Sequence, residues 1–310
     1  MSIPVLFSAR DALWETYHAA LPAACARAGL DIALTRDPAA TNARYIVYAP
    51  NDALRDFTPF TQAKAVLSLW AGVETIVSNP TLTQPLARMV DPGLREGMRD
   101  YVVGHVMRAH LGMDAHIVNP THAWIASAPP LARDRRVSVL GLGNLGETCA
   151  VALAMLGFDV AGWSRRPKQI EGITCLSGDA GLRAALARAD ILVTLLPATP
   201  ETDNLLNAET LACLPQGASI INPGRGTLID DDALLAALDT GQVAQATLDV
   251  FRTEPLPSDD RFWAHPRVTV TPHIASETRA DTASDAIADN IRRGEAGLPF
   301  RHLVDRSAGY

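Results

Sequence analysis

The chain has 310 residues, of which 48% are hydrophobic and 20% charged, and its formal net charge is −7. This composition is typical of a globular protein, and a negative balance without a basic field gives nucleic acid no electrostatic attraction. The length exceeds what one compact core usually holds, so we expect two domains of about 150 residues each with a cleft between them.

The four cysteines are far apart and show no Cys-x-x-Cys spacing; they are Cys25, Cys149, Cys175 and Cys213. This pattern predicts neither a zinc site nor a disulfide framework, and it favours a reducing cytoplasm. The first residues lack a basic leader with a long apolar run, and no apolar stretch reaches 18 residues. We therefore expect no export signal and no membrane-spanning segment.

The first third of the chain alternates short apolar runs with turn residues and one helical pattern over 11–28. The predicted strands cover 5–7, 32–34, 45–48, 65–69 and 75–77. Such alternation predicts a small parallel α/β unit, and this one carries no glycine fingerprint.

One loop of this unit, Trp70, Ala71 and Gly72, follows a predicted strand. Ligands of open α/β sheets are held at that edge, and backbone N–H groups there could hold a carboxylate. An ordinary turn at the end of a strand explains these residues equally well.

A helical pattern over 94–111 precedes an irregular stretch that reaches Pro130, which we interpret as an arm leading into the next domain. The histidines nearby have no carboxylate at ligand spacing and are interpreted as surface or packing residues; they are His105, His110, His116 and His122. Trp124 on the arm is interpreted as a packing residue, with a contact across a dimer interface as the alternative.

The most informative stretch is an apolar run over 137–140, rich in β-branched residues, followed by Gly-x-Gly-x-x-Gly and an alanine-rich segment. A strand, a tight turn and a helix in this order form a dinucleotide-binding fingerprint. The helix N-terminus offers unpaired N–H groups to a pyrophosphate. The predicted cofactor contacts are Gly141, Gly143, Asn144, Leu145 and Gly146.

The end of the next predicted strand, 158–163, suggests which dinucleotide binds. NAD-preferring sites usually carry an acidic residue about 20 residues past the glycines. Here Ser164 occupies that position, and Arg165, Arg166 and Lys168 follow it. An arginine can bind a 2′-phosphate through charge-assisted hydrogen bonds, so we expect NADPH to be preferred; a solvated basic turn is the alternative.

Further strands, predicted over 191–196, 219–222, 244–250 and 268–271, alternate with helical runs over 180–187 and 230–238. Three strand ends carry ionisable residues within 222–226, 248–255 and 271–275. The carboxyl ends of parallel strands meet at one edge of a sheet, so we expect these residues to converge beside the cofactor.

At these motifs the chain resembles the D-isomer-specific 2-hydroxyacid dehydrogenases, over nearly all of its length. The motifs Asn-x-x-Arg-Gly, Leu-Asp-Val-Phe-x-x-Glu-Pro and Thr-Pro-His follow the fingerprint in the family's order, and Arg225 and Glu254 lie 29 residues apart, 254 − 225. Down to its terminus at 304–310 the chain is similar to the type A glyoxylate/hydroxypyruvate reductases. The resemblance implies a substrate domain over 1–99 with 279–310, a Rossmann domain over 100–278, an active-site cleft between them and a homodimer.

Reduction of a 2-keto acid needs a cation for the carboxylate and ketone, a proton donor for the alkoxide and an aligned nicotinamide. Arg225 suits the first role and His273 the second, with Glu254 favouring the imidazolium and orienting the ring. By resemblance, Asp249 would bind the nicotinamide carboxamide, and Ala71 and Gly72 the substrate carboxylate. No metal is expected.

Two departures limit what the resemblance implies, and the first, at Trp70, leaves the substrate open. The bulky Trp70 stands where a glycine is common, and Pro223-Gly224 precedes Arg225 where many members have a small residue and alanine. The alternatives are a dehydrogenase of another D-2-hydroxy acid and a non-catalytic dinucleotide-sensing protein of the same fold. Formate dehydrogenases of this fold fit poorly, since they use glutamine where Glu254 stands.

Overall fold

A computed structural model describes residues 2–117 and 119–306; residues 307–310 of the C-terminal motif lie outside the described part. The chain divides into two compact units, Met1–Leu94 with Glu277–Tyr310 and Arg95–Ser276. The domain limits expected from the sequence, at 99/100 and 278/279, stay a prediction.

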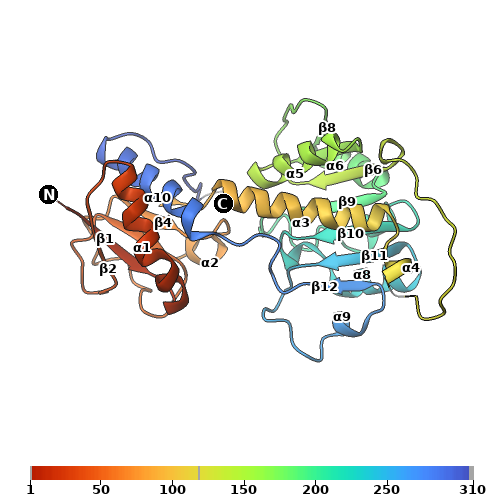
Figure 1. Ribbon diagram of the computed structural model, residues 1–310, viewed down its shortest axis with the longest axis horizontal. Helices are drawn as coiled ribbons and strands as arrows, with labels where there is room; N and C mark the ends of the chain where they lie inside the picture. The colour runs from red at the N-terminus through yellow and green to blue at the C-terminus, as the bar shows by residue number, and fades with distance from the viewer. Residues whose placement is uncertain (1, 118, 307–310) are drawn as a thin grey trace. The chain divides into compact units, whose positions relative to one another are not determined.

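The first unit contains a five-stranded parallel sheet (Figure 1). Its strands are, in spatial order, β2 (Ile32–Thr35), β1 (Ile3–Ser8), β3 (Tyr45–Tyr48), β4 (Ala65–Ser68) and β5 (Leu86–Ala87). This is the flavodoxin-like order. Every residue of β3 and β4 is buried, which explains why these strands appear in the sequence as continuous apolar runs.

The helices of the first unit are α1 (Asp11–Arg27), α2 (Glu74–Val77) and α10 (Ala280–Glu295). Helices α1 and α10 pack on one face of the sheet through a shared core that includes Leu21 and Ile287. The strand predicted over 75–77 is wrong, because this segment forms α2: the N–H groups of Ile76 and Val77 donate to the carbonyl of Val73. β-branched residues favour strands only weakly, and local hydrogen bonding prevails here.

The second unit contains a seven-stranded parallel sheet. Its strands are, in spatial order, β12 (Val268–Val270), β11 (Val243–Leu248), β10 (Ala218–Asn222), β9 (Ile191–Thr194), β6 (Arg136–Leu140), β7 (Asp159–Ser164) and β8 (Thr174–Ser177). The direction of strand succession reverses between β6 and β9, which defines the topological switch point at which such sheets bind ligands. Two parallel α/β sheets confirm the predicted fold class.

The helical segments that remain are α3 (Pro92–His110), α4 (Asp114–Ile117), η1 (Ala132–Asp134), α5 (Asn144–Met155), α6 (Gly178–Ala187), α7 (Ala208–Ala212), η2 (Gly226–Leu228), α8 (Asp231–Asp239) and α9 (Arg261–Ala264). Helix α3 begins with Pro92, and the carboxylate of Asp91 accepts the N–H of Gly93 at 3.0 Å. Proline in the first turn after an acidic cap is a favoured helix start. Val102 and Val106 of α3 pack with Val139 of β6, so α3 covers one face of the second sheet.

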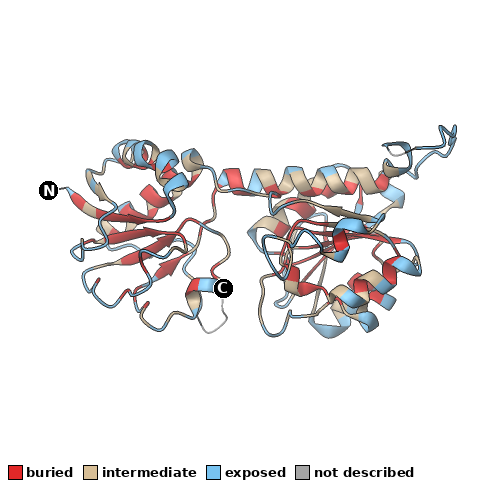
Figure 2. Cartoon of the chain, turned by 90° about the horizontal axis from the view of Figure 1, so that it is seen from below, coloured by how far each residue is buried: buried red, intermediate tan, exposed pale blue. Residues whose placement is uncertain are grey.

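Figure 2 shows the central strands of both sheets largely in the buried colour and the arm after α4 in the exposed colour. Every residue over 120–131 is exposed. Trp124 is 95% exposed, so its interpretation as a packing residue is wrong within a single chain. The described helices include none that is both long and apolar enough to cross a membrane.

Candidate active site

The glycine fingerprint forms the predicted turn between β6 and α5. Gly141 has a φ of +102°, a conformation that favours glycine, and its N–H donates to the carbonyl of Trp163 at 2.8 Å. A Cβ at Gly146 would lie 1.7 Å from the carbonyl oxygen of Gly141, so only glycine allows the helix to start this close to the turn. Asn144 and Leu145 form the first turn of α5, whose N–H groups are available to an anion.

Gly143 is different, because a Cβ there would meet no atom within 4 Å. The side of Gly143 where a side chain would lie is therefore open, at the N-terminus of the helix. A pyrophosphate needs such an opening to approach the backbone closely. This open position fits a dinucleotide.

Gly143→Ala is accordingly expected to leave the melting temperature within about 1 °C of wild type while weakening NADPH binding by roughly tenfold, about 1.4 kcal/mol. Differential scanning fluorimetry and NADPH fluorescence titration measure the two quantities. Gly146→Ala is the matched control, since its Cβ meets backbone and should lower the melting temperature as well. Wild-type NADPH affinity in Gly143→Ala would contradict the assignment.

The basic turn after β7 holds the residues predicted to select the cofactor. Ser164 ends β7 and its hydroxyl donates to the carbonyl of Arg166 at 2.7 Å. The side chains of Arg165 and Arg166 are exposed. Lys168 bonds to the carbonyl of Leu142 within the fingerprint and lies 3.1 Å from Glu147, so it ties the basic turn to the glycine turn.

The second unit brings the ends of three adjacent strands, β10, β11 and β12, to one edge of its sheet. Arg225 follows β10, Asp249 follows β11, and His273 follows β12. A Cβ at Gly226 would lie 2.1 Å from the carbonyl carbon of Phe251, so the arginine loop is in close contact with the segment leading to Glu254.

Glu254 and His273 form a hydrogen-bonded pair, with 2.7 Å between Oε2 and Nδ1. The other carboxylate oxygen of Glu254 accepts the N–H of Phe251 at 2.9 Å, which fixes the carboxylate. Because Nδ1 is used, Nε2 of His273 remains for a reactant, and 52% of the His273 side chain is exposed. An imidazole oriented by a carboxylate is an arrangement suited to proton transfer.

Arg225 is held by a residue to which the sequence had given no role, Asn222. Its amide nitrogen donates to the carbonyl of Arg225 at 3.0 Å, and its oxygen accepts from Thr194 and from the N–H of Gly224. The side chain is 1% exposed. An asparagine at a strand end, two residues before a glycine, is the signal that could have indicated this turn.

The departure from the family at Gly224 has a structural reason. A Cβ there would lie 2.7 Å from the carbonyl oxygen of Thr194, so alanine would require a backbone shift. Arg225 itself is half-buried, and its Nη1 donates to the carbonyl of Gly224 at 2.7 Å.

Asp249 is completely buried. Its carboxylate accepts hydrogen bonds from the Thr271 hydroxyl and from the N–H groups of Ile274 and Ala275. Its predicted contact with a nicotinamide carboxamide would require a neighbouring group to move and stays a prediction.

The predicted substrate loop belongs to the first unit. The Ser68 hydroxyl contacts both the N–H and the carbonyl of Trp70 at 3.0 Å, and the N–H of Met89 donates to the same carbonyl. Within the described part of the chain, the N–H groups of Ala71 and Gly72 donate to no protein acceptor. They are thus available to a ligand, and the Trp70 residue is 39% exposed.

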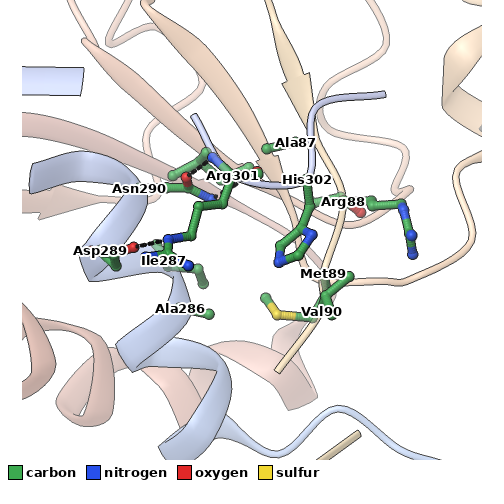
Figure 3. A pocket seen from close by; sticks show the side chains of 12 residues that line it. Ala87, Arg88, Met89, Val90, Ala286, Ile287, Asp289, Asn290, Arg301 and His302 are labelled. Carbon is green, nitrogen blue, oxygen red and sulfur yellow. Dashed lines mark hydrogen bonds and ion pairs between the residues drawn. The ribbon is translucent and has the colours of Figure 1, made fainter. Parts of the chain in front are cut away.

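A pocket of the first unit lies between β4, β5, α10 and the segment at 301–302 (Figure 3), and none of the predicted site residues lines it. Arg301 pairs there with Asp289 at 2.9 Å, and its N–H donates to Asn290 at 2.8 Å. These bonds anchor the returning chain to α10, a structural role.

Two of the four cysteines, Cys25 and Cys149, are buried. Burial raises the pKa of the Cys25 thiol to about 11 and that of Cys149 to about 12, so both thiols are poor nucleophiles. Among the described residues, no group of three or more potential ligands is placed to hold a metal ion.

Known proteins are similar to this chain in sequence and in fold. Residues 106–275 match the model of the family described as "D-isomer specific 2-hydroxyacid dehydrogenase, NAD binding domain". A glyoxylate/hydroxypyruvate reductase A of Yersinia enterocolitica is 42% identical over 257 residues, which cover 80% of this chain and 82% of that protein.

Solved structures also match this chain over their full length and over its own. A D-isomer specific 2-hydroxyacid dehydrogenase of Xanthobacter autotrophicus Py2, in complex with NADPH and MES, is 40% identical with a TM-score of 0.92 and 100% coverage of both chains. An NADPH-dependent glyoxylate/hydroxypyruvate reductase of Sinorhizobium meliloti, in complex with NADP and sulfate, is 34% identical with a TM-score of 0.88 and the same coverage.

Proposed function

We propose, from the premise that this chain belongs to the D-isomer specific 2-hydroxyacid dehydrogenase family, that it reduces glyoxylate, hydroxypyruvate or similar short 2-keto acids with NADPH. The products are the 2-hydroxy acids, glycolate or D-glycerate, and NADP⁺. The observation that carries this proposal is the 2.7 Å pair of His273 and Glu254, at the sheet edge that also bears Arg225.

The site residues divide the tasks of this reaction. The fingerprint glycines Gly141, Gly143 and Gly146 would hold NADPH, which would supply the hydride to the carbonyl carbon. The guanidinium of Arg225 holds the carboxylate and polarises the ketone oxygen, and Nε2 of His273 gives that oxygen its proton. Glu254 keeps the ring oriented through its hydrogen bond with Nδ1. The free N–H groups of Ala71 and Gly72 bind the substrate carboxylate, and Trp70 limits the size of the substrate's side chain.

The second candidate is a dinucleotide-sensing protein that binds NADPH without turnover, since the fingerprint alone would suffice for binding. Absorbance at 340 nm separates the two: the reductase consumes NADPH when glyoxylate or hydroxypyruvate is added, and the sensor does not. Saturable NADPH binding without turnover of either keto acid would favour the dinucleotide-sensing protein over the reductase.

NADPH preference rests on Ser164, Arg165 and Arg166. Each hydrogen bond to a charged group contributes about 1.5 to 3 kcal/mol, so Arg165→Ala or Arg166→Ala should weaken NADPH binding roughly tenfold or more. NADH, which lacks the 2′-phosphate, should bind each variant as it binds wild type. Titration of both cofactors measures this, and equal wild-type affinity for the two would refute the preference.

We also propose a cytoplasmic homodimer. The exposed arm supports the dimer, because large apolar side chains on the arm and at its ends are exposed in the single chain. They are Met113, Ile117, Trp124, Ile125 and Leu131. Isolated chains rarely leave so many apolar groups together in water. Light scattering that gives one copy of the 33.1 kDa chain would oppose this proposal.

A further inference from the structure

A hydrogen-bond chain connects helix α3 with the segment that carries His273. The hydroxyls of Tyr101 and Thr271 lie 2.7 Å apart, and the Thr271 hydroxyl lies 2.6 Å from Oδ1 of Asp249. A threonine hydroxyl has one proton, and a carboxylate only accepts. Thr271 therefore donates to Asp249, and Tyr101 donates to Thr271, so the chain has one direction.

The Tyr101 hydroxyl is suited to donate. Burial raises the pKa of this phenol, and the charge of Asp249 adds to the effect. The centroid of the phenol ring lies 4.4 Å from that of the His105 ring, and the two planes are tilted by 46°. The pKa of His105 is lowered by burial and by the charge of Arg108. The phenol thus keeps its proton at neutral pH and can donate to Thr271.

At the other end of the chain, Asp249 binds the backbone on both sides of the His273 side chain. Its main-chain carbonyl accepts the N–H of His273 at 2.8 Å, and its carboxylate accepts those of Ile274 and Ala275, both at 2.9 Å. His273 has a φ of +54°, in the left-handed region that is uncommon for residues other than glycine. Surrounding bonds must hold such a conformation.

We propose that Tyr101 and Thr271 are positioning residues for His273: their hydrogen-bond chain fixes the carboxylate of Asp249, which in turn holds His273 in its left-handed conformation next to Glu254. The proposal rests on the proposed function of His273 as the proton donor. Neither residue touches substrate in this scheme, and both act on the rate of the proton-transfer step through the backbone of 273–275.

Thr271→Val tests the chain, since it keeps the shape of the side chain and removes the hydroxyl. We expect kcat to fall about tenfold, the effect of one hydrogen bond to a charged group. The Kd of NADPH and the KM of the keto acid should remain within about twofold. Thr271→Ser, the matched control, keeps the donor and should retain kcat within about twofold. All rates are expressed per site that binds NADPH, so that unfolded protein does not enter kcat.

Tyr101→Phe provides the second variant, with an expected threefold decrease in kcat. In the double variant Tyr101→Phe/Thr271→Val, kcat should equal that of Thr271→Val, because the phenol acts only through the threonine. If the two single effects multiply in the double variant, the proposed hydrogen-bond chain is overturned. Wild-type kcat in Thr271→Val would overturn it as well. Equal losses of kcat in the Val and Ser variants would overturn it too.

His273→Asn, measured in parallel, separates this proposal from the proposed function. If His273→Asn turns over at the wild-type rate, the proton donor has been misassigned and the proposed function of His273 fails. If it is inactive while Thr271→Val is fully active, the donor stands and only the positioning chain fails.

Discussion

Replacement of His273 by alanine is expected to lower kcat for keto-acid reduction by about 100- to 10,000-fold, the usual contribution of a positioned general acid. The affinity for NADPH should hardly change, because the substitution leaves the glycine fingerprint between β6 and α5 intact. Stopped-flow or steady-state NADPH oxidation measures kcat, and fluorescence titration measures the Kd.

A second variant is needed because alanine could also disturb the backbone at this position. His273 has a positive φ of +54°, which alanine adopts poorly and asparagine adopts more readily. His273→Asn therefore keeps the loop and removes only the proton donor, and it should be as slow as His273→Ala. An active His273→Asn would show that the loop conformation, not the imidazole, limits the rate.

Glu254→Gln belongs to the same prediction. In reduction the His273 ring gives up a proton, while its Nδ1 donates a hydrogen bond to the Glu254 carboxylate at 2.7 Å. A glutamine at 254 keeps the shape of the side chain without the charge, so kcat should fall about tenfold, the effect of one hydrogen bond to a charged group. Steady-state NADPH oxidation measures this, and wild-type kcat in Glu254→Gln would show that the reaction does not depend on the carboxylate.

The second large effect is expected at Arg225. Its guanidinium can make two parallel hydrogen bonds to the substrate carboxylate and ketone, each worth about 1.5 to 3 kcal/mol, so Arg225→Gln should reduce kcat/KM roughly 100-fold or more. Steady-state kinetics with glyoxylate measures this.

Arg225→Lys is the control for charge. A lysine keeps the cation but loses the planar fork, so its kcat/KM should lie between those of wild type and Arg225→Gln. Because Asn222 holds the main chain of this loop independently of the guanidinium, both variants should keep the wild-type melting temperature. Wild-type kcat/KM in Arg225→Gln would remove Arg225 from the reaction.

The sequence alone determined the features that depend on local pattern. A β-branched run, three spaced glycines and an alanine-rich segment predicted β6, the turn and α5, because each signal comes from neighbouring residues with fixed periodicity. The same logic predicted the three strand ends, and the family match confirms the resemblance that those motifs carried. The roles of Arg225, Glu254 and His273 stay predictions.

Local pattern failed where a segment's surroundings decide its structure. The β-branched stretch at 75–77 became α2, and the sheet took its edge strand from Leu86–Ala87, a pair too short to be recognised in the sequence. Tryptophan is usually a packing residue, yet the exposure of Trp124 depends on the path of the whole arm.

Only the tertiary structure showed what holds the reacting groups. Tyr101 and Thr271 are separated by 170 residues, and Thr271 and Asp249 by 22, so no spacing in the sequence indicates that the three share hydrogen bonds. Likewise, Asn222 meets Thr194 across 28 residues of chain. A hydrogen-bonding group has a few donor or acceptor sites, and which partners occupy them is decided by the packing of α3 and of strands β9 to β12, not by the residues beside it in the chain.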